Sequence, residues 1–555
     1  MRIISLLRRL FMLGVPAILL QSCAHKTAVD LILYNSLVYT VDSAFTRQEA
    51  FAIKDGKILD IGMSKDILNA YSSLQKIDAR GKPVFPGFTD AHAHFYSYAL
   101  GLQEADLVGT SSWMECIERI QKYIQNKKIA PGEWVIGRGW DQNDWDLKEF
   151  PDRELLDRNF PQNPVFLSRI DGHAAIVNKM AIDKAHILPG KKLAGGQVEN
   201  RNGRLTGILI DNAVGLVRQW IPDAANLNFL KKALSEAQRN CFEVGLTTVE
   251  DCGLMKEQVD QIDSLQKSGD LKMKIVALLS DAKSNYDYYL KKGPYKSARL
   301  NVIGFKLYAD GALGSRGACL LAPYRDKPGW YGFLLSRPQY YDSILQVIAQ
   351  SSFQACTHAI GDSGNRTILR AYARVLQGKN DRRWRIEHAQ VIDKNDFEWF
   401  GKYNIIPSVQ PTHATSDMYW ASDRLGPERV KGAYAFRQLL EQNGWIPLGT
   451  DFPVEDISPL KTFYAAVSRQ DAKNFPPGGF QPENALSREQ ALRGMTIWAA
   501  KGAFEEKEKG SLEKGKSADF IILEDDIMKC QLPQVLKTKI LATYINGEKV
   551  FGRDN

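Results

Sequence analysis

Residues 84–94 read Val84-Phe85-Pro86-Gly87-Phe88-Thr89-Asp90-Ala91-His92-Ala93-His94. The apolar run ends in a Pro-Gly step, and two histidines follow with one residue between them. Side chains two positions apart on an extended segment point to the same face. We therefore expect His92 and His94 to direct both imidazoles at one point, as two ligands of a single metal ion require.

The middle of the chain alternates short apolar runs with helical stretches, the pattern of βα units around a parallel sheet. Helical segments such as 228–243, 341–351, 365–377 and 435–443 separate the runs. Eight repeats predict an α/β fold, a (β/α)8 TIM-type barrel over residues 85–507 with a large insertion at about 96–225. The predicted strands are 84–94, 246–253, 274–279, 302–309, 354–358, 384–388, 405–410 and 446–451.

Six polar residues stand at the carboxyl ends of five of these predicted strands. Enzymes built on this barrel carry their chemistry at that face. Any one histidine there could be a hydrogen-bonded core residue, but four histidines, a lysine and an aspartate together favour a metal centre. The six are His92, His94, Lys306, His358, His388 and Asp451.

Both ends of the chain carry short strand-like runs joined by tight turns. In residues 29–84, Asp55-Gly56 separates two alternating runs and predicts a hairpin. Residues 508–555 show the same pattern of short strand-like runs, with Asn546-Gly547 as the turn. We expect the two regions to form one composite β-sandwich domain.

The N-terminus begins with basic residues and an apolar stretch from Leu10 to Leu20, which is too short to span a bilayer. Residues 1–22 therefore predict a secretory signal. Small residues before Cys23 resemble a bacterial lipobox, which implies cleavage before Cys23 and a lipid anchor on that residue. The expected location is an exported, membrane-anchored lipoprotein that faces the periplasm or the cell exterior.

The charge pattern argues against nucleic acid as a partner. The net charge of +8 is spread along the chain, and no Lys/Arg-rich run with interleaved aromatic residues is present. The expected partner is a small-molecule substrate, and the sequence leaves open whether the chain forms a homo-oligomer. Tryptophans of the insertion, Trp113, Trp134, Trp140, Trp145 and Trp220, favour either an apolar or ring-containing substrate group or a core for the insertion itself.

Several motifs resemble those of the metal-dependent amidohydrolase superfamily, in particular its YtcJ-like (amidohydrolase 3) branch. Besides His92-x-His94, the later single histidines and Asp451, the resemblance covers nearly all of the chain after the predicted signal. The matching segments are 132–141, 171–174, 310–316, 358–362, 449–454 and 510–520.

The resemblance implies a centre of two divalent metal ions, expected to be zinc. His92, His94 and Asp451 would hold the first ion, and His358 and His388 the second. Lys306 would carry a carbamate that bridges both ions, since an ammonium beside two dications is disfavoured. The alternative for Lys306 is an ion pair with an acidic neighbour such as Asp310.

The resemblance also implies a reaction, the hydrolysis of a non-peptide carbon–nitrogen bond in an amide, cyclic amide or formamide. Asp451 would act as general base toward metal-activated water and then as acid toward the leaving nitrogen. His413 could donate a hydrogen bond to the developing oxyanion. His173 and Asp310 are expected to bind substrate.

Two other functions stay open at this level. A deaminase of an amino-substituted ring would need only one metal ion and an unmodified Lys306. A catalytically inactive binding lipoprotein could retain the barrel, although no ligand position has lost its expected residue. Fold class alone does not separate these functions, because this barrel hosts many chemistries.

Overall fold

The computed structural model describes residues 26–222 and 227–553. Cys23 and the predicted signal at 1–22 lie outside the described residues, so the lipid anchor stays a prediction. Within the described residues, no helix is both long enough and apolar enough to cross a bilayer.

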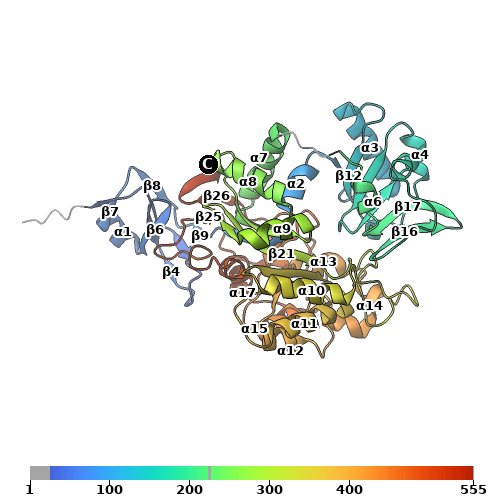
Figure 1. Cartoon of the computed structure of the whole chain (residues 1–555). Coiled ribbons are helices and arrows are strands. Elements are labelled where there is room, and N and C mark those ends of the chain that lie inside the picture. The colour runs from blue at the N-terminus through green and yellow to red at the C-terminus, as the bar shows by residue number, and fades with distance from the viewer. Residues whose placement is uncertain (1–25, 223–226, 554–555) are drawn as a thin grey trace, which may run out of the picture.

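Seven parallel strands form a nearly closed barrel at the centre of the molecule (Figure 1). Apolar side chains line each strand and pack with the surrounding helices into the largest hydrophobic core. The predicted α/β barrel is confirmed to this extent. In hydrogen-bonded order the strands are β10 (Phe88–Ala93), β18 (Leu246–Leu254), β19 (Lys274–Ser280), β21 (Leu300–Tyr308), β22 (Gln354–Ala359), β23 (Arg385–His388) and β24 (Ile406–Ser408).

The predicted eighth strand, residues 446–451, is not a strand in the structure. This segment nevertheless lies between β24 and β10: Leu448 bridges Val409, and its carbonyl accepts from the amide of Ala91. Pro447 cannot donate to a ladder, and Asp451 has a left-handed backbone with φ 64°. The segment therefore closes the barrel with a few bonds rather than a regular ladder.

Residues 84–94 are not one strand either. Pro86 ends β9 (Pro83–Pro86), which pairs with strands outside the barrel, and β10 starts at Phe88. Gly87 lies where the chain passes from one sheet to the other. Only glycine fits there, because a Cβ would lie 2.3 Å from Thr247 Cγ2. The stretch that carries the two histidines thus links the barrel to the terminal sheets.

Helices follow most barrel strands and cover the outside of the barrel (Figure 1). The four predicted helices are present, with ends within a few residues of those expected. The main ones are α2 (Phe95–Gly101), α7 (Leu227–Glu243), α8 (Lys256–Lys267), α9 (Lys283–Lys292), α10 (Pro338–Ala349), α11 (Asp362–Leu376), α12 (Phe397–Tyr403), α13 (Pro411–Asp417), α14 (Ala421–Arg429), α15 (Phe436–Asn443), α16 (Pro459–Ser468), α17 (Arg488–Gly494) and α18 (Ile497–Gly502).

Strands from both ends of the described chain pair in one six-stranded sheet and face a four-stranded sheet. Buried apolar side chains of the two sheets, such as Phe51 and Phe520, share one hydrophobic core. The six-stranded sheet runs β27 (Glu548–Gly552), β26 (Ile540–Ile545), β25 (Phe520–Leu523), β9, β3 (Leu37–Tyr39) and β4 (Arg47–Gln48), and the other runs β6 (Lys57–Gly62), β5 (Ala50–Lys54), β2 (Leu31–Tyr34) and β8 (Gln75–Asp78).

Between α2 and α7 the chain forms a separate seven-stranded sheet beside the barrel (Figure 1). The ring of Trp145 lies about 6 Å from those of Trp113 and Trp140 in the core of this sheet, so the three tryptophans serve packing rather than the cavity described below. The sheet runs β11 (Ala105–Asp106), β12 (Val135–Trp140), β13 (Val165–Arg169), β14 (Ala174–Val177), β17 (Arg204–Asp211), β16 (Gly196–Arg201) and β15 (Lys192–Leu193), and α3 (Trp113–Lys127) packs on it.

Candidate metal centre

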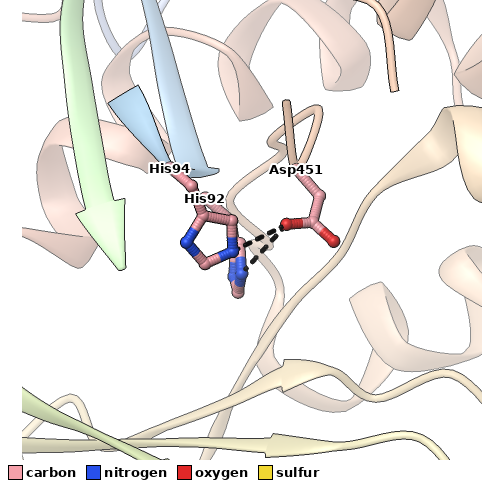
Figure 2. Close-up of side chains that lie close together, drawn as sticks. All are labelled: His92, His94 and Asp451. Atoms are coloured by element: carbon pink, nitrogen blue, oxygen red, sulfur yellow. Dashed lines mark ion pairs between the residues drawn. The ribbon is translucent and has the colours of Figure 1, made fainter. Parts of the chain in front are cut away.

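His92 and His94 lie at the carboxyl end of β10 and face Asp451 (Figure 2). Asp451 Oδ1 lies 3.5 Å from His92 Nε2 and 3.2 Å from His94 Nε2. The three residues offer ligand atoms within 4.8 Å of one another, close enough to hold one metal ion. The pairing of His92 with His94 predicted from their spacing is therefore present in the geometry.

His358 and His388 complete a ring of histidines around this point. The His388 ring centroid lies 4.8 Å from that of His92 and 4.6 Å from that of His358. His388 and Asp451 both have left-handed backbones, with φ of 72° and 64°. Such conformations are strained for residues other than glycine and concentrate at functional sites.

Lys306 lies beneath the histidines, with 1% of its surface exposed. Its Nζ is 3.0 Å from His92 Nε2. Among the described residues no carboxylate lies within ion-pair distance of this ammonium, so the alternative pairing with Asp310 is not present. All six polar residues predicted at the strand ends thus converge on one place.

Glu387 orients His92, a contact that the sequence did not reveal. Glu387 Oε2 lies 2.6 Å from His92 Nδ1, and Oε1 lies 2.9 Å from Arg385 Nε. Arg385 in turn pairs with Glu250 at 2.5 Å, and all three charged residues are fully buried. The signal was present in residues 384–388, where an arginine and a glutamate interrupt a run expected to be buried.

Buried ligand-type atoms that form ion pairs at most, and no hydrogen bond, test whether these residues fit a metal ion. His358 Nε2, His388 Nδ1 and Asp451 Oδ1 are buried and make no hydrogen bond. Burial lowers the pKa of His92 to about 4, aided by the nearby Lys306 charge, and lowers those of His358 and His388 well below their usual value. Neutral imidazoles and an ionised carboxylate are the ligands that a divalent ion such as zinc requires. The donor set fits.

His413, in the first turn of α13, is held between two carboxylates. Its Nε2 lies 3.2 Å from Asp451 Oδ2, and its Nδ1 lies 3.1 Å from Glu455 Oε1. Burial alone would lower the pKa of His413, but these two contacts raise it well above its usual value. Both ring nitrogens of His413 thus contact a carboxylate. To donate the predicted hydrogen bond to an oxyanion, His413 would have to give up one of these two contacts.

His173 reaches the site from the seven-stranded sheet, between β13 and β14. Its Nδ1 lies 2.6 Å from Asp211 Oδ1, and its ring centroid lies 4.9 Å from that of His358. Asp211 is a further partner that the sequence did not reveal. This contact leaves Nε2 of His173 for a substrate.

Asp310 is fully buried and lies behind the histidines, 3.8 Å from His358 Nε2. Its carboxylate accepts hydrogen bonds from the backbone amides of Cys319, Ile360 and Gly361, at 2.7 to 3.0 Å. These contacts favour an anchoring role for Asp310. Its substrate-binding role stays a prediction.

A cavity of about 730 Å³ opens over the histidines, between the barrel and the seven-stranded sheet. Its volume is in the range of small-molecule sites. Its wall is acidic, because it contains more aspartates and glutamates than arginines, which are Arg138 and Arg169. His94, His173, His358, His388, His413 and Asp451 line it, whereas His92, Lys306 and Asp310 do not.

A model of the amidohydrolase family matches residues 75–551 of this sequence. The chain belongs to the amidohydrolase family. It is 33% identical over 543 residues to the protein LONG AFTER FAR-RED 3 of Arabidopsis thaliana, covering 94% of this chain and 91% of that protein. It is 28% identical over 531 residues to YtcJ of Bacillus subtilis strain 168, covering 94% and 99%. The predicted YtcJ-like branch is thereby confirmed.

Two further comparisons bear on the chemistry of this amidohydrolase. The chain is 24% identical over 543 residues to an N-substituted formamide deformylase of Arthrobacter pascens, covering 93% of this chain and 97% of that protein. The crystal structure of an uncharacterized metal-dependent hydrolase from Pyrococcus furiosus matches with TM-score 0.70 and 29% identity, covering 90% and 100%. The chain is a hydrolase of carbon–nitrogen bonds.

Proposed function

We propose that this amidohydrolase binds divalent metal at the histidine cluster and cleaves a non-peptide carbon–nitrogen bond of an amide, cyclic amide or formamide. One observation carries the proposal: ligand-type atoms from four strands and the closing segment converge under one cavity. The relative named for formamide deformylation supports formamides as the first substrates to test.

Metal ions bound here would polarise the substrate carbonyl and lower the pKa of water toward neutrality. Asp451 is the base of the proposed reaction. Burial would raise the pKa of this carboxyl, but the hydrogen bond from His413 and the neighbouring His92 lower it well below its usual value. The carboxyl is therefore ionised at neutral pH, which is the form that can take a proton from the attacking water before returning it to the leaving nitrogen.

Four other side chains hold Asp451 and the substrate in position. His413, backed by Glu455, holds Asp451 Oδ2 in place. Asp211 fixes the ring of His173, so that His173 Nε2 can donate to the substrate from the inserted sheet. The inserted sheet thus contributes to substrate binding as well as covering the barrel mouth.

The proposed centre would hold two zinc ions, with a carbamate on Lys306 as an additional anionic ligand. Its support is the burial of Lys306 next to His92 with no carboxylate partner among the described residues. His92, His94 and Asp451 would hold one ion, and His358 and His388 the other. Metal content per chain and intact-mass analysis test this: two ions and a carboxylated lysine are expected. One ion with unmodified Lys306 would favour a deaminase.

Asp451→Asn tests the base directly. We expect turnover of N-substituted formamides by the zinc-reloaded protein to fall by about 10³-fold or more. Asp456→Asn is the matched control, because Asp456 lines the same cavity but pairs with Lys461 instead of the histidines. Near-normal turnover by the metal-loaded Asp451→Asn protein would contradict the role. A protein that binds metal and small molecules but turns over no substrate would favour the inactive lipoprotein.

We also propose the finer architecture expected from the sequence. The two facing sheets built from residues near both ends act as one composite β-sandwich domain, supported by their common core. The sheet between α2 and α7 acts as an insertion that caps the barrel. Export and a lipid anchor on Cys23 are part of the same proposal, supported by the lipobox-like sequence alone.

A further inference from the structure

A second cavity, of about 370 Å³, lies between the insertion, the loop after β21 and helix α14. In Figure 1, α14 lies on the side of the barrel next to the inserted sheet. The cavity contains none of the proposed metal ligands. Its charged lining comprises Lys148, Arg316, Arg325 and Arg424 against Asp326 and Asp423.

Cations are in excess around this second cavity. Arg316 and Arg424 share one carboxylate, that of Asp326. Among the described residues no carboxylate lies within ion-pair distance of Lys148 or Arg325. The cavity is therefore positively charged, in contrast to the acidic wall of the cavity over the histidines.

Two buried side chains of the second cavity hold donors without acceptors. Arg424 is 5% exposed, and its Nε makes no hydrogen bond. Asn143 is 7% exposed; its Oδ1 accepts from Arg424 Nη2 at 3.0 Å, while its Nδ2 has no acceptor. Buried donors left unpaired cost free energy, so an acceptor supplied by a ligand would be favourable here.

We propose that this second cavity binds a small oxyanion, a phosphate or a carboxylate group. Guanidinium groups match the planar and tetrahedral oxygens of such anions, and three arginines surround the space. Trp420 lines both cavities. The anion can therefore come from two sources: a free ion, or the acidic end of a substrate that extends past Trp420 from the catalytic cavity.

Inorganic phosphate, titrated calorimetrically into the metal-loaded protein at low ionic strength, is the first probe. Lys148→Gln combined with Arg325→Gln removes two cations that hold no ion pair, and should weaken binding at least about tenfold. Arg370→Gln with Lys184→Gln removes the same charge from exposed positions elsewhere and should leave binding unchanged. Asp423→Asn, which removes an anion from the lining, should strengthen binding.

Three results would overturn the proposal. These are no phosphate binding at millimolar concentration, equal weakening in both double variants, or undiminished binding in Lys148→Gln/Arg325→Gln. The last would place phosphate elsewhere, for example on the metal centre. A phosphate-induced change in tryptophan fluorescence that disappears in Trp420→Phe would support binding at this cavity.

Turnover then separates the two sources of the anion. If phosphate inhibits hydrolysis of a formamide with a terminal carboxylate but not of its uncharged analogue, the cavity holds the acidic end of the substrate. If it affects both equally or neither, the cavity holds a free ion. Because binding is measured without turnover, failure of the proposed hydrolase activity would leave this inference standing.

Discussion

Glu387 shows how a single buried carboxylate can determine the ligand properties of a histidine. By contacting Nδ1 of His92, it fixes the tautomer that presents Nε2 toward the metal position. Burial would raise the pKa of Glu387, but Arg385 and His92 lower it below its usual range. A permanently ionised Glu387 keeps the imidazole in one orientation.

Glu387→Gln should therefore weaken zinc binding about 10- to 100-fold, since partners of this kind affect metal affinity to that extent. Competition with a zinc-sensitive chelator measures the change. Glu250→Gln is the matched control, because Glu250 pairs with the same Arg385 but does not contact His92. Equal losses in both variants would mean that the charge around Arg385, and not the orientation of His92, sustains the affinity.

Asp310 joins elements, since its carboxylate ties the loop after β21 to the amides that follow β22. Burial raises the pKa of this carboxyl to about 7, against the effect of the three amide donors. An unfolded aspartate ionises near pH 4. Between these values the folded chain binds more protons than the unfolded chain, so stability is lost as the pH rises from about 4 to about 7.

Asp310→Asn removes this titration. Near pH 4, where all three amides have an acceptor, we expect the wild type to have a larger free energy of unfolding than the variant. This difference should shrink by at most about 4 kcal/mol as the pH rises to 7. Urea unfolding at several pH values measures it. Asp183→Asn, at an exposed position, should show no such trend. A difference that stays constant with pH would mean that Asp310 remains ionised in the folded protein.

The segment that closes the barrel depends on a glycine. A Cβ on Gly449 would lie 2.5 Å from the backbone nitrogen of His92 and 2.8 Å from Asp90 Oδ1. Gly449→Ala should therefore push Asp451 away from His92, lower stability by about 1–3 kcal/mol and weaken zinc binding. Thermal unfolding and zinc titration measure both effects. Gly215→Ala, where a Cβ meets nothing within 4 Å, should change neither, and an unaffected Gly449→Ala would contradict the tight closure.

The barrel could be predicted because apolar runs alternate with helical stretches, and five of the eight runs end in polar residues, as in 302–306 and 354–358. Residues 446–451 show the same pattern, but long-range bonds to Ala91 and His92 hold them without a ladder. The charged residues within 384–388 indicate that Glu387 has a buried partner, but the contact with His92 spans 295 residues, so the local sequence does not identify that partner. The pairing of β25 with β9 likewise depends on tertiary packing.

At the scale of the whole molecule, the sheets from the two ends are fastened to the barrel. Lys274, at the start of β19, forms a buried ion pair of 2.6 Å with Asp519, next to β25. The residues directly before β10 form β9, a strand of the six-stranded sheet. His92 and His94 therefore lie on the segment that connects the six-stranded sheet to the barrel, and their positions depend on both.

Metal should consequently stabilise the entire fold rather than one loop. The proposed ligands lie on β10, β21, β22, β23 and the closing segment, so a bound ion ties together most of the barrel circumference. At a free ion concentration 100 times Kd, binding to the folded state alone contributes about 2.7 kcal/mol. Removing the metal with a chelator should lower Tm by several degrees, and adding zinc back should restore it.

Variants make this last effect specific. His94→Ala removes a ligand and should lose most of the difference between chelated and zinc-loaded protein, whereas His186→Ala, at an exposed histidine far along the insertion, should keep it. Differential scanning fluorimetry at fixed zinc concentration gives both values. An unchanged Tm after removal of metal that the protein demonstrably held would mean that the barrel is rigid without it. In that case the metal would serve only chemistry, and the six converging residues would have to be held in place by Glu387, Asp310 and the closing segment alone.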